Sequence, residues 1–267
     1  MQFRNITYND LDEIRKLQPE GWPDIVPEVE YYIGKRFCYP VKAISDNEIV
    51  GIGTLIVFDN TGWLAHIIVN KNYRNRGVGS QITQKLINIG NEKSVKTLLL
   101  IATELGLPIY KKAGFRAVTE YQYFKRIKPW EDFQLSPNIF SNEDSFHSMI
   151  YELDEIISGE NRRSLLADYL KNSLVYIEDN SVQGFYMPDL GEGLVLASTT
   201  DAGLELIKMK YSKVDKAVLP TDNYIAANFL KRNGFTLSDT KGTRMILWKE
   251  IDWEPEHVFG RIGGNYG

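Results

Sequence analysis

A repeated segment constrains this chain of 267 residues more than any other feature of its sequence. Ile109–Phe115 and Phe229–Phe235 share one pattern, which is two apolar residues, Lys, a basic residue, a small or polar residue, Gly and Phe. Each copy follows an apolar segment, at 97–102 and at 216–219. Because self-similarity at a long spacing indicates a duplicated structural unit, we predict two lobes of about 130 residues, each with its own core.

The hydrophobic periodicity of both halves predicts a mixed α/β fold. Alternating segments and turn residues predict a hairpin in each half, around the turns Ser45-Asp46-Asn47 and Asp179-Asn180-Ser181. We expect strands at 2–8, 41–44, 49–58, 63–69, 97–102, 117–125, 175–177, 182–186 and 194–197, and helices from about 10, from about 80 and over 108–113. The prediction is two tandem lobes, each a mixed β-sheet flanked by helices, over residues 1–128 and 141–267 with a linker at 129–140.

Charge and composition exclude several classes of protein. The net charge of −4 argues against a general nucleic-acid binder. No run approaches the roughly 18 apolar residues of a membrane span, and the charges within residues 1–20 do not fit a signal peptide, so we expect a cytoplasmic protein without a membrane partner. Residues 1–128 hold 18 basic and 13 acidic residues, against 13 and 22 in residues 129–267. Either this uneven distribution of charge reflects the charge of the ligands that each half binds, or it carries no function. Cys38, the one cysteine, receives no role.

The segment Arg74-Asn-Arg-Gly-Val-Gly79 joins an expected strand to an expected helix. Two glycines allow close approach of the backbone, successive N–H groups point inward, and a helix N-terminus adds positive dipole, so such a turn can bind a pyrophosphate. The segment lacks the Gly-Lys-Ser/Thr ending of nucleoside triphosphatases and the third glycine of dinucleotide-binding folds. Taken alone, it is also compatible with a plain strand-to-helix connection.

In its context this segment resembles motif A of the GCN5-related N-acetyltransferase (GNAT) superfamily, Arg/Gln-x-x-Gly-x-Gly/Ala, which Arg74, Gly77 and Gly79 match in full. The stretch 63–69 resembles the superfamily's fourth strand, and Ala102-Thr103, Gly106, Tyr110 and Gly114-Phe115 resemble its motif B. The second half, through 153–162, 226–235 and 258–267, resembles the C-terminal lobe of tandem bacterial GNAT proteins of the YitH type. The resemblance implies two GNAT-like lobes.

The resemblance implies direct transfer of an acetyl group from acetyl-CoA, as co-substrate, to an amine. A main-chain N–H on the fourth strand would polarise the thioester carbonyl, and the Tyr110 phenol would protonate the departing thiolate. The residues that it implies for coenzyme binding are Ile67, Ile68, Val69, Arg74, Asn75, Arg76, Gly77, Val78, Gly79, Ser80, Thr103 and Tyr110. A half-buried Tyr110 that only packs its helix is the alternative.

An ammonium acceptor must lose a proton before it attacks. The sequence does not name the base, and the candidates by position are Glu28, Glu30, His66 and Glu104, of which Glu28 and His66 join Tyr110 in the predicted catalytic set. Each also has an ordinary interpretation, as a solvated face or a strand histidine. The three histidines are too scattered for a metal site, so no metal is predicted.

The second lobe departs from motif A at the corresponding place. After the strand at 194–197 it reads Ser-Thr-Thr-Asp-Ala-Gly-Leu-Glu, with Asp201 where a phosphate would lie, and Leu230 stands opposite Tyr110. We therefore predict a degenerate second lobe and a single coenzyme site, in the first lobe. The segment 260–267 is either a flexible tail or an ordered latch.

For the acceptor we predict a small, positively charged amine bound between the lobes, because the second lobe is acidic. The aromatic residues Trp22, Tyr31, Tyr32, Phe37 and Tyr39 either wall the acceptor pocket or pack a helix. A non-catalytic acyl-CoA-binding sensor and a protein-modifying acetyltransferase are the alternatives. The protein would be a monomer or a homodimer.

Overall fold

A computed structural model describes all of residues 1–267. The chain forms two compact units: unit 1 comprises 1–116, 245–249 and 264–266, and unit 2 comprises 117–244, 250–263 and 267. Both units are mixed α/β, which confirms the predicted fold class. The predicted boundaries at 128 and 141 stay a prediction. The helices include none that is both long and apolar enough to cross a membrane.

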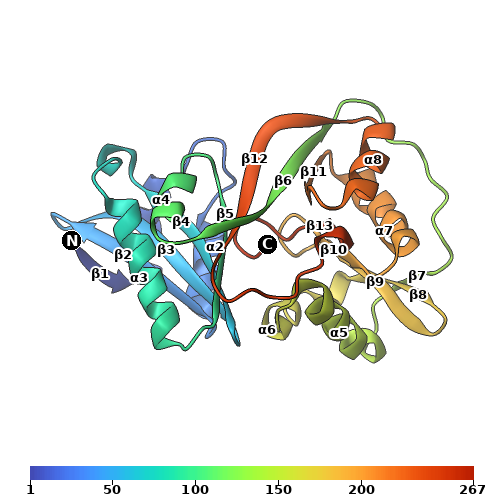
Figure 1. The fold of residues 1–267 in the computed structure, drawn as a ribbon, viewed down its shortest axis with the longest axis horizontal. Helices are drawn as coiled ribbons and strands as arrows, with labels where there is room; N and C mark the ends of the chain where they lie inside the picture. The colour runs from blue at the N-terminus through green and yellow to red at the C-terminus, as the bar shows by residue number, and fades with distance from the viewer. The chain divides into compact units, whose positions relative to one another are not determined.

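Unit 1 is built on one sheet (Figure 1). Its strands lie in the order β1-β2-β3-β4-β5, followed by the last residues of β12, and only β4 and β5 are shown to run parallel. Its elements are β1 (Gln2–Asn5), η1 (Tyr8–Asp10), α1 (Leu11–Ile14), η2 (Arg15–Leu17), α2 (Val26–Gly34), β2 (Cys38–Ser45), β3 (Glu48–Phe58), β4 (Thr61–Val69), η3 (Lys71–Tyr73), α3 (Val78–Glu92), β5 (Thr97–Ala102) and α4 (Leu107–Lys112).

Each face of this sheet has its own apolar cluster. On one face α3 packs through Ile82 and Leu86 close to Gly51 and Gly53 of β3, where a Cβ atom would lie within 3 Å of Ile82. On the other face α1 and α2 cover a second cluster that includes Ile14 and Val29. The helices expected from about residues 10 and 80 therefore bury an apolar face against the sheet, whereas α2 was not predicted from the sequence.

Unit 2 contains two groups of strands. One is a sheet in the order β13-β10-β9-β8-β7, and the other is the first part of β12 with β6 and β11. Its elements are β6 (Arg116–Arg126), β7 (Ile139–Ser141), η4 (Asp144–Phe146), α5 (His147–Ser158), α6 (Arg163–Leu166), η5 (Leu170–Asn172), β8 (Leu174–Glu178), β9 (Ser181–Met187), β10 (Leu194–Ala197), α7 (Thr200–Lys213), β11 (Lys216–Pro220), α8 (Tyr224–Arg232), β12 (Phe235–Trp248), η6 (Pro255–His257) and β13 (Val258–Gly260). The first residue of β6, Arg116, and the last residues of β12, from Met245 on, belong to unit 1.

The repeated segments form the same local structure in both units. α4 and α8 end just before Gly114 and Gly234, whose φ angles of +97° and +86° lie in the left-handed region that favours glycine. The segment predicted as a linker, 129–140, packs against unit 2, because the Trp130 ring contacts Tyr211, Phe229 and Phe235. The two repeated segments therefore share the same helix end in both units.

Candidate active site

β4 and β5 separate shortly after they begin to pair. Their ladder joins only Thr61–Trp63 to Thr97–Leu99, although β4 continues to Val69 and β5 to Ala102. The second half of β4 therefore has one edge that β5 does not cover. Unpaired backbone groups at such an edge are available to a ligand, since each non-proline residue carries one donor and one acceptor.

A bulge lies in this uncovered part of β4. The β3–β4 register advances from Thr54↔Ala65 to Ile52↔Ile68, which leaves one extra residue in β4, and His66 has a φ angle of +46°. A left-handed angle in a residue other than glycine is uncommon and marks a strained position. Because the Asn70 N–H bonds to Val50 of β3 at 2.9 Å, the alternation of the strand directs the N–H group of Val69 away from β3. Ile67 lies in the bulge itself, outside the regular pairing with β3.

The loop after β4 leaves the start of α3 open. Asn75 and Gly77 adopt φ angles of +60° and +78°, and Gly77 caps the helix without any side-chain hydrogen bond. The first helical bond runs from Gln81 N–H to the Gly77 carbonyl, 3.1 Å, so the N–H groups before Gln81 have no acceptor in the helix. No acidic side chain lies in the first turn, and Arg74 and Arg76 are exposed beside it.

Tyr110 lies on α4, half-buried against the core beneath α3. Its ring contacts Phe115 edge-on, with centroids 6.2 Å apart, and a Cβ atom on Gly106 would meet the ring at 2.7 Å. Burial raises the pKa of the Tyr110 hydroxyl to about 12. The phenol is therefore protonated at neutral pH and can donate a proton.

Polar side chains gather on the α2 side of the β4 bulge. The Tyr32 hydroxyl lies 2.9 Å from His66 Nδ1 and also bonds to the Glu28 carboxylate, one helical turn before it on α2. The side-chain amide of Asn265, which belongs to unit 1, donates to Glu28 Oε2 at 3.2 Å and to the Tyr32 oxygen at 2.9 Å. Glu28, Tyr32, His66 and Asn265 thus form one hydrogen-bonded network.

Two proton arrangements are compatible with the bonds of this network. Either Tyr32 donates to the ionised Glu28, which only accepts, and accepts from His66 Nδ1–H, or Tyr32 donates to His66 Nδ1. The two protons of the Asn265 amide supply the two bonds that it makes. In the first arrangement His66 carries its proton on Nδ1, and its Nε2 keeps a lone pair that can accept a proton.

Burial sets the charge states of the two titratable groups in this network. It lowers the pKa of His66 to about 4, so the imidazole is neutral at physiological pH. Burial also raises the pKa of Glu28. The hydrogen bonds from Tyr32 and Asn265 act in the opposite direction, because they favour the ionised carboxylate. A neutral imidazole beside a hydrogen-bonded carboxylate is an arrangement that can take up a proton at Nε2.

The structure brings together some of the predicted site residues and not others. Glu30 and Glu104 are exposed and make no hydrogen bond to the network. The backbone carbonyl of Thr103 accepts bonds from Gly106 and Leu107 and so starts α4. Of the aromatic residues, Tyr32 joins the network and Trp22 contacts the His66 ring with centroids 6.2 Å apart, whereas Tyr39 packs under Lys93.

Sequence reasoning missed the polar role of Tyr32 and the whole role of Asn265. Tyr32 follows Glu28 by four residues, and this helical spacing was a usable signal because it places both side chains on one face. Asn265 had none, since an Asn in a Gly-rich segment reads as a loop residue. The segment 260–267 is ordered and is not a flexible tail, because the Tyr266 side chain is 2% exposed.

The corresponding place in unit 2 is closed. After β10 only Ser198 and Thr199 precede α7, and the Thr199 hydroxyl accepts the Ala202 N–H at 3.3 Å. β13 pairs with β10 and contacts β11, so it lies where the two strands would otherwise separate. Phe259 fills the space above the first turn of α7, where a Cβ atom on Gly203 would lie 2.3 Å from its ring.

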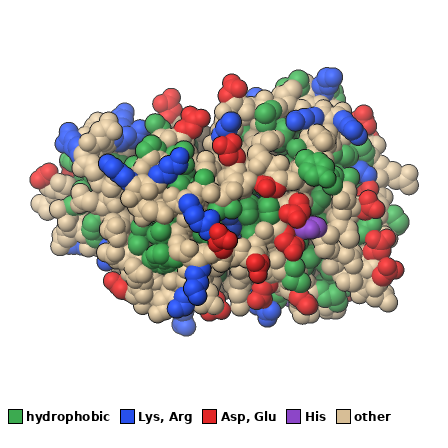
Figure 2. All heavy atoms as spheres, in the orientation of Figure 1, with side chains coloured by type: hydrophobic (Ala, Val, Ile, Leu, Met, Phe, Trp, Pro, Cys, Tyr) green, Lys and Arg blue, Asp and Glu red, His purple; other side chains and the backbone are tan.

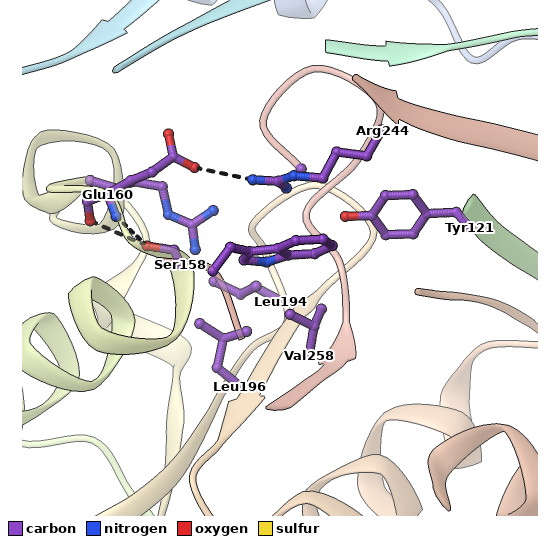
Figure 3. Close-up of a pocket in the computed structure, with 10 residues that line it drawn as sticks. Tyr121, Ser158, Glu160, Leu194, Leu196, Arg244 and Val258 are labelled. Carbon is purple, nitrogen blue, oxygen red and sulfur yellow. Dashed lines mark hydrogen bonds and ion pairs between the residues drawn. The ribbon is translucent and has the colours of Figure 1, made fainter. Parts of the chain in front are cut away.

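The cavity that remains near β10 and β13 is small and charged (Figure 3). Its volume is about 10 Å³, room for about one water molecule. In Figure 3 the Glu160 carboxylate and the Arg244 guanidinium face each other across it, with N···O at 4.0 Å. Arg244 also stacks over Trp253, 3.9 Å from the ring centroid. A coenzyme does not fit this cavity.

Comparison with known proteins agrees with this description. The model of the acetyltransferase (GNAT) family matches residues 8–115. YitH of Bacillus subtilis, described as an uncharacterized N-acetyltransferase, is 25% identical over 222 residues, which are 74% of this chain and 77% of YitH.

Two solved structures share the fold of nearly the whole chain. A protein of Pyrococcus horikoshii, provisionally described as an acetyltransferase, has a TM-score of 0.83 at 19% identity and covers 100% of this chain and 95% of its own. A GCN5-related N-acetyltransferase of Sphaerobacter thermophilus has a TM-score of 0.64 at 14% identity, over 95% and 98% of the two chains.

The fold and the family match define an acyltransferase that depends on acetyl-CoA. Residues 8–115 match the GNAT acetyltransferase family, and the similarity to YitH extends over 74% of this chain.

Proposed function

We propose that unit 1 transfers an acetyl group from acetyl-CoA to a primary amine of a small molecule, in a complex that holds both substrates. One observation carries the proposal: along the uncovered part of β4, an open anion-binding turn and a network with a free imidazole nitrogen both border the strand. A direct transfer needs donor and acceptor sites that meet at one point.

The turn after β4 fits the pyrophosphate of the coenzyme. The N–H groups of Val78, Gly79 and Ser80 would bind its oxygens, since α3 supplies them no acceptor and its dipole favours an anion. Gly79 keeps the approach free, because a Cβ atom there would already touch Ile109 and Val69 at 3.4 and 3.6 Å. The guanidinium groups of Arg74 and Arg76 add positive charge at the exposed rim.

When bound, acetyl-CoA supplies an activated acetyl group as a thioester. The Ile67 N–H, in the bulge of β4, would donate to the thioester oxygen as negative charge develops on it, a contribution of about 3 to 4 kcal/mol per donor. Tyr110 would give its phenolic proton to the departing sulfur, and the pKa of about 12 keeps that proton available at neutral pH.

His66 is the base of this proposal. The bound ammonium first gives one N–H proton to Nε2, which passes it to solvent. The neutral nitrogen then bonds to the acetyl carbon and loses a second proton to Nε2, while the carbon–sulfur bond breaks and Tyr110 gives its proton to the sulfur. His66 and Tyr110 return to their starting states by proton exchange with solvent, and one proton is released in total. Glu28 acts through Tyr32, because its carboxylate holds the hydroxyl that accepts from His66 Nδ1–H.

A cationic amine fits the charge of this region. Glu28 places a half-buried carboxylate beside His66, and Trp22, which is 44% exposed, offers an aromatic ring next to it. Residues 129–267 carry 22 acidic against 13 basic residues, and acidic side chains are spread over the visible face of unit 2 (Figure 2). Such a field raises the local concentration of a cation.

The test is thiol release from acetyl-CoA with polyamines, amino acids and aminoglycosides, each at low and high salt. We expect transfer to at least one cationic amine, with kcat/KM falling as salt rises because the attraction is screened. Coenzyme binding without transfer to any amine would instead select an acyl-CoA-binding sensor. Salt-independent rates with every acceptor would contradict the cationic acceptor.

A further inference from the structure

We infer that Asn265 is a positioning residue of the acetyltransferase site. Its side-chain amide holds Tyr32 and Glu28 in place, so that His66 presents Nε2 to the amine acceptor. The inference rests on the proposed function and extends it to a residue 199 positions beyond His66 in the chain. The segment 264–266 belongs to unit 1 together with α2 and β4. The network is therefore complete within one compact unit.

Asn265 touches two members of the network at once. Its Nδ2 lies 3.2 Å from Glu28 Oε2 and 2.9 Å from the Tyr32 oxygen. These bonds use both amide protons, and they hold Glu28 beside the Tyr32 hydroxyl, where Tyr32 can donate to Glu28 and accept from His66. Without them, the Tyr32 hydroxyl could rotate and donate to His66 Nδ1, which would move the imidazole proton to Nε2 and abolish the base.

Tyr266 anchors the segment that carries Asn265. Its ring lies 6.3 Å from Tyr32 at an interplanar angle of 73° and 6.4 Å from Phe58 at 36°, and it is 2% exposed. Asn265 itself is half-buried. The packing energy of the segment thus belongs mainly to Tyr266, so a change at Asn265 separates proton positioning from folding.

An exchange of charge between Glu28 and Asn265 gives a sharp test. In Asn265→Asp, two carboxylates face each other and one must hold a proton, so we expect kcat to fall at least about tenfold with little change in the KM for acetyl-CoA. In Glu28→Gln with Asn265→Asp, one carboxylate and one amide are present again with exchanged places. Because Tyr32 can then donate to Asp and accept from Gln and His66, kcat should recover most of the loss.

The matched control is Asn161→Asp, the same substitution at an exposed asparagine of unit 2. It should leave kcat unchanged. If Asn265→Asp is as active as the wild type, or if the double variant is no better than the single one, the inference is overturned. A wild-type enzyme that transfers acetyl to no amine would count against the proposed function instead.

A second readout does not depend on activity. The chain has three histidines, so long-range ¹H–¹⁵N spectra can resolve the ring nitrogens of His66. We expect a protonated Nδ1 and a bare Nε2 in the wild type, loss of that pattern in Asn265→Asp, and its return in the double variant. A bare Nδ1 in the wild type would overturn the assignment of the base, and an unchanged His66 in Asn265→Asp would remove Asn265 from it.

Discussion

The two units use the same strand–turn–helix in opposite ways. In unit 1, Asn70–Gly77 form a turn before α3, the N-cap Gly77 makes no side-chain hydrogen bond to the helix start, and β5 diverges from β4. In unit 2, Ser198 and Thr199 lead directly into a capped α7, and β13 occupies the place beside β10. The place that is open in unit 1 is therefore closed in unit 2. A short segment of the chain's own sequence stabilises unit 2 where unit 1 keeps backbone groups available.

Other contacts hold β13 in that place. The Asn223 side chain donates to the Val258 carbonyl at 3.1 Å, and His257 Nδ1 lies 2.8 Å from the Ala197 carbonyl at the end of β10. Both use polar groups that a ligand would otherwise meet. The closure of unit 2 is thus a built feature of its core rather than a loop lying across an open site.

Removal of the aromatic ring that fills unit 2 gives the largest expected effect. Phe259 is 2% exposed and packs against Ala202 and Leu206, so Phe259→Ala should lower the free energy of unfolding by about 3 to 5 kcal/mol. Urea unfolding measures it, with Phe140→Ala as the control, since Phe140 is 47% exposed. A loss below about 1 kcal/mol would mean that β13 does not close unit 2 as described.

Obstruction of the turn in unit 1 should affect binding instead. Gly77→Val with Gly79→Val places side chains where the pyrophosphate would lie, and we expect the Kd for acetyl-CoA to rise more than about 100-fold, or about 2.7 kcal/mol. Gly21→Val is a matched control, because Gly21 has the same φ of +78° as Gly77 and no neighbour within 4 Å. It carries the same backbone strain but should leave coenzyme binding intact. Unimpaired binding in the double variant would contradict the assignment of the turn.

Tyr110 and Leu230 occupy the same position in the two repeated segments, so they allow a direct comparison of the two units. Leu230 is fully buried in the core of unit 2, whereas Tyr110 carries a hydroxyl. Tyr110→Phe should lower kcat about 100-fold without raising the Kd for acetyl-CoA, as measured by steady-state kinetics and calorimetry. Tyr224→Phe, at a tyrosine that is 66% exposed, serves as control. An unchanged kcat would return Tyr110 to a packing role.

The smallest effect concerns pH. Burial lowers the pKa of His66 from 6.5 to about 4, so between these values the unfolded chain binds more protons than the folded one. The free energy of unfolding therefore falls as the pH is lowered, by about 2 kcal/mol between pH 7 and 5 from this group. His66→Gln should flatten that slope, and His147→Gln should not. Equal slopes in the wild type and His66→Gln would show that His66 is not buried as a neutral imidazole.

Local signals account for what the sequence could predict. The strands at 97–102 and 194–197 were predicted with the observed bounds, and the turn at Asp46 and Asn47 has the positive φ angles that such residues tolerate. The turn after β4 and the apolar face of α3 follow from glycine placement and helical spacing. These features depend on neighbours in the sequence.

Long-range pairing could not be predicted in the same way. β13 has only three residues and finds its partner β10 about 60 residues earlier. Likewise β12 contributes Phe235–Arg244 to unit 2 and Met245–Trp248 to unit 1, which no local pattern specifies. The contact of Asn265 with Glu28 spans 237 positions. The closure of unit 2 and the completion of the network therefore became visible only in three dimensions.

The most direct test of this account is the number of acetyl-CoA molecules that one chain binds, measured by isothermal titration calorimetry on the full-length protein. A single open turn in unit 1 and a filled one in unit 2 predict a stoichiometry of one. Two bound molecules per chain, or one that persists when valines replace Gly77 and Gly79, would contradict it.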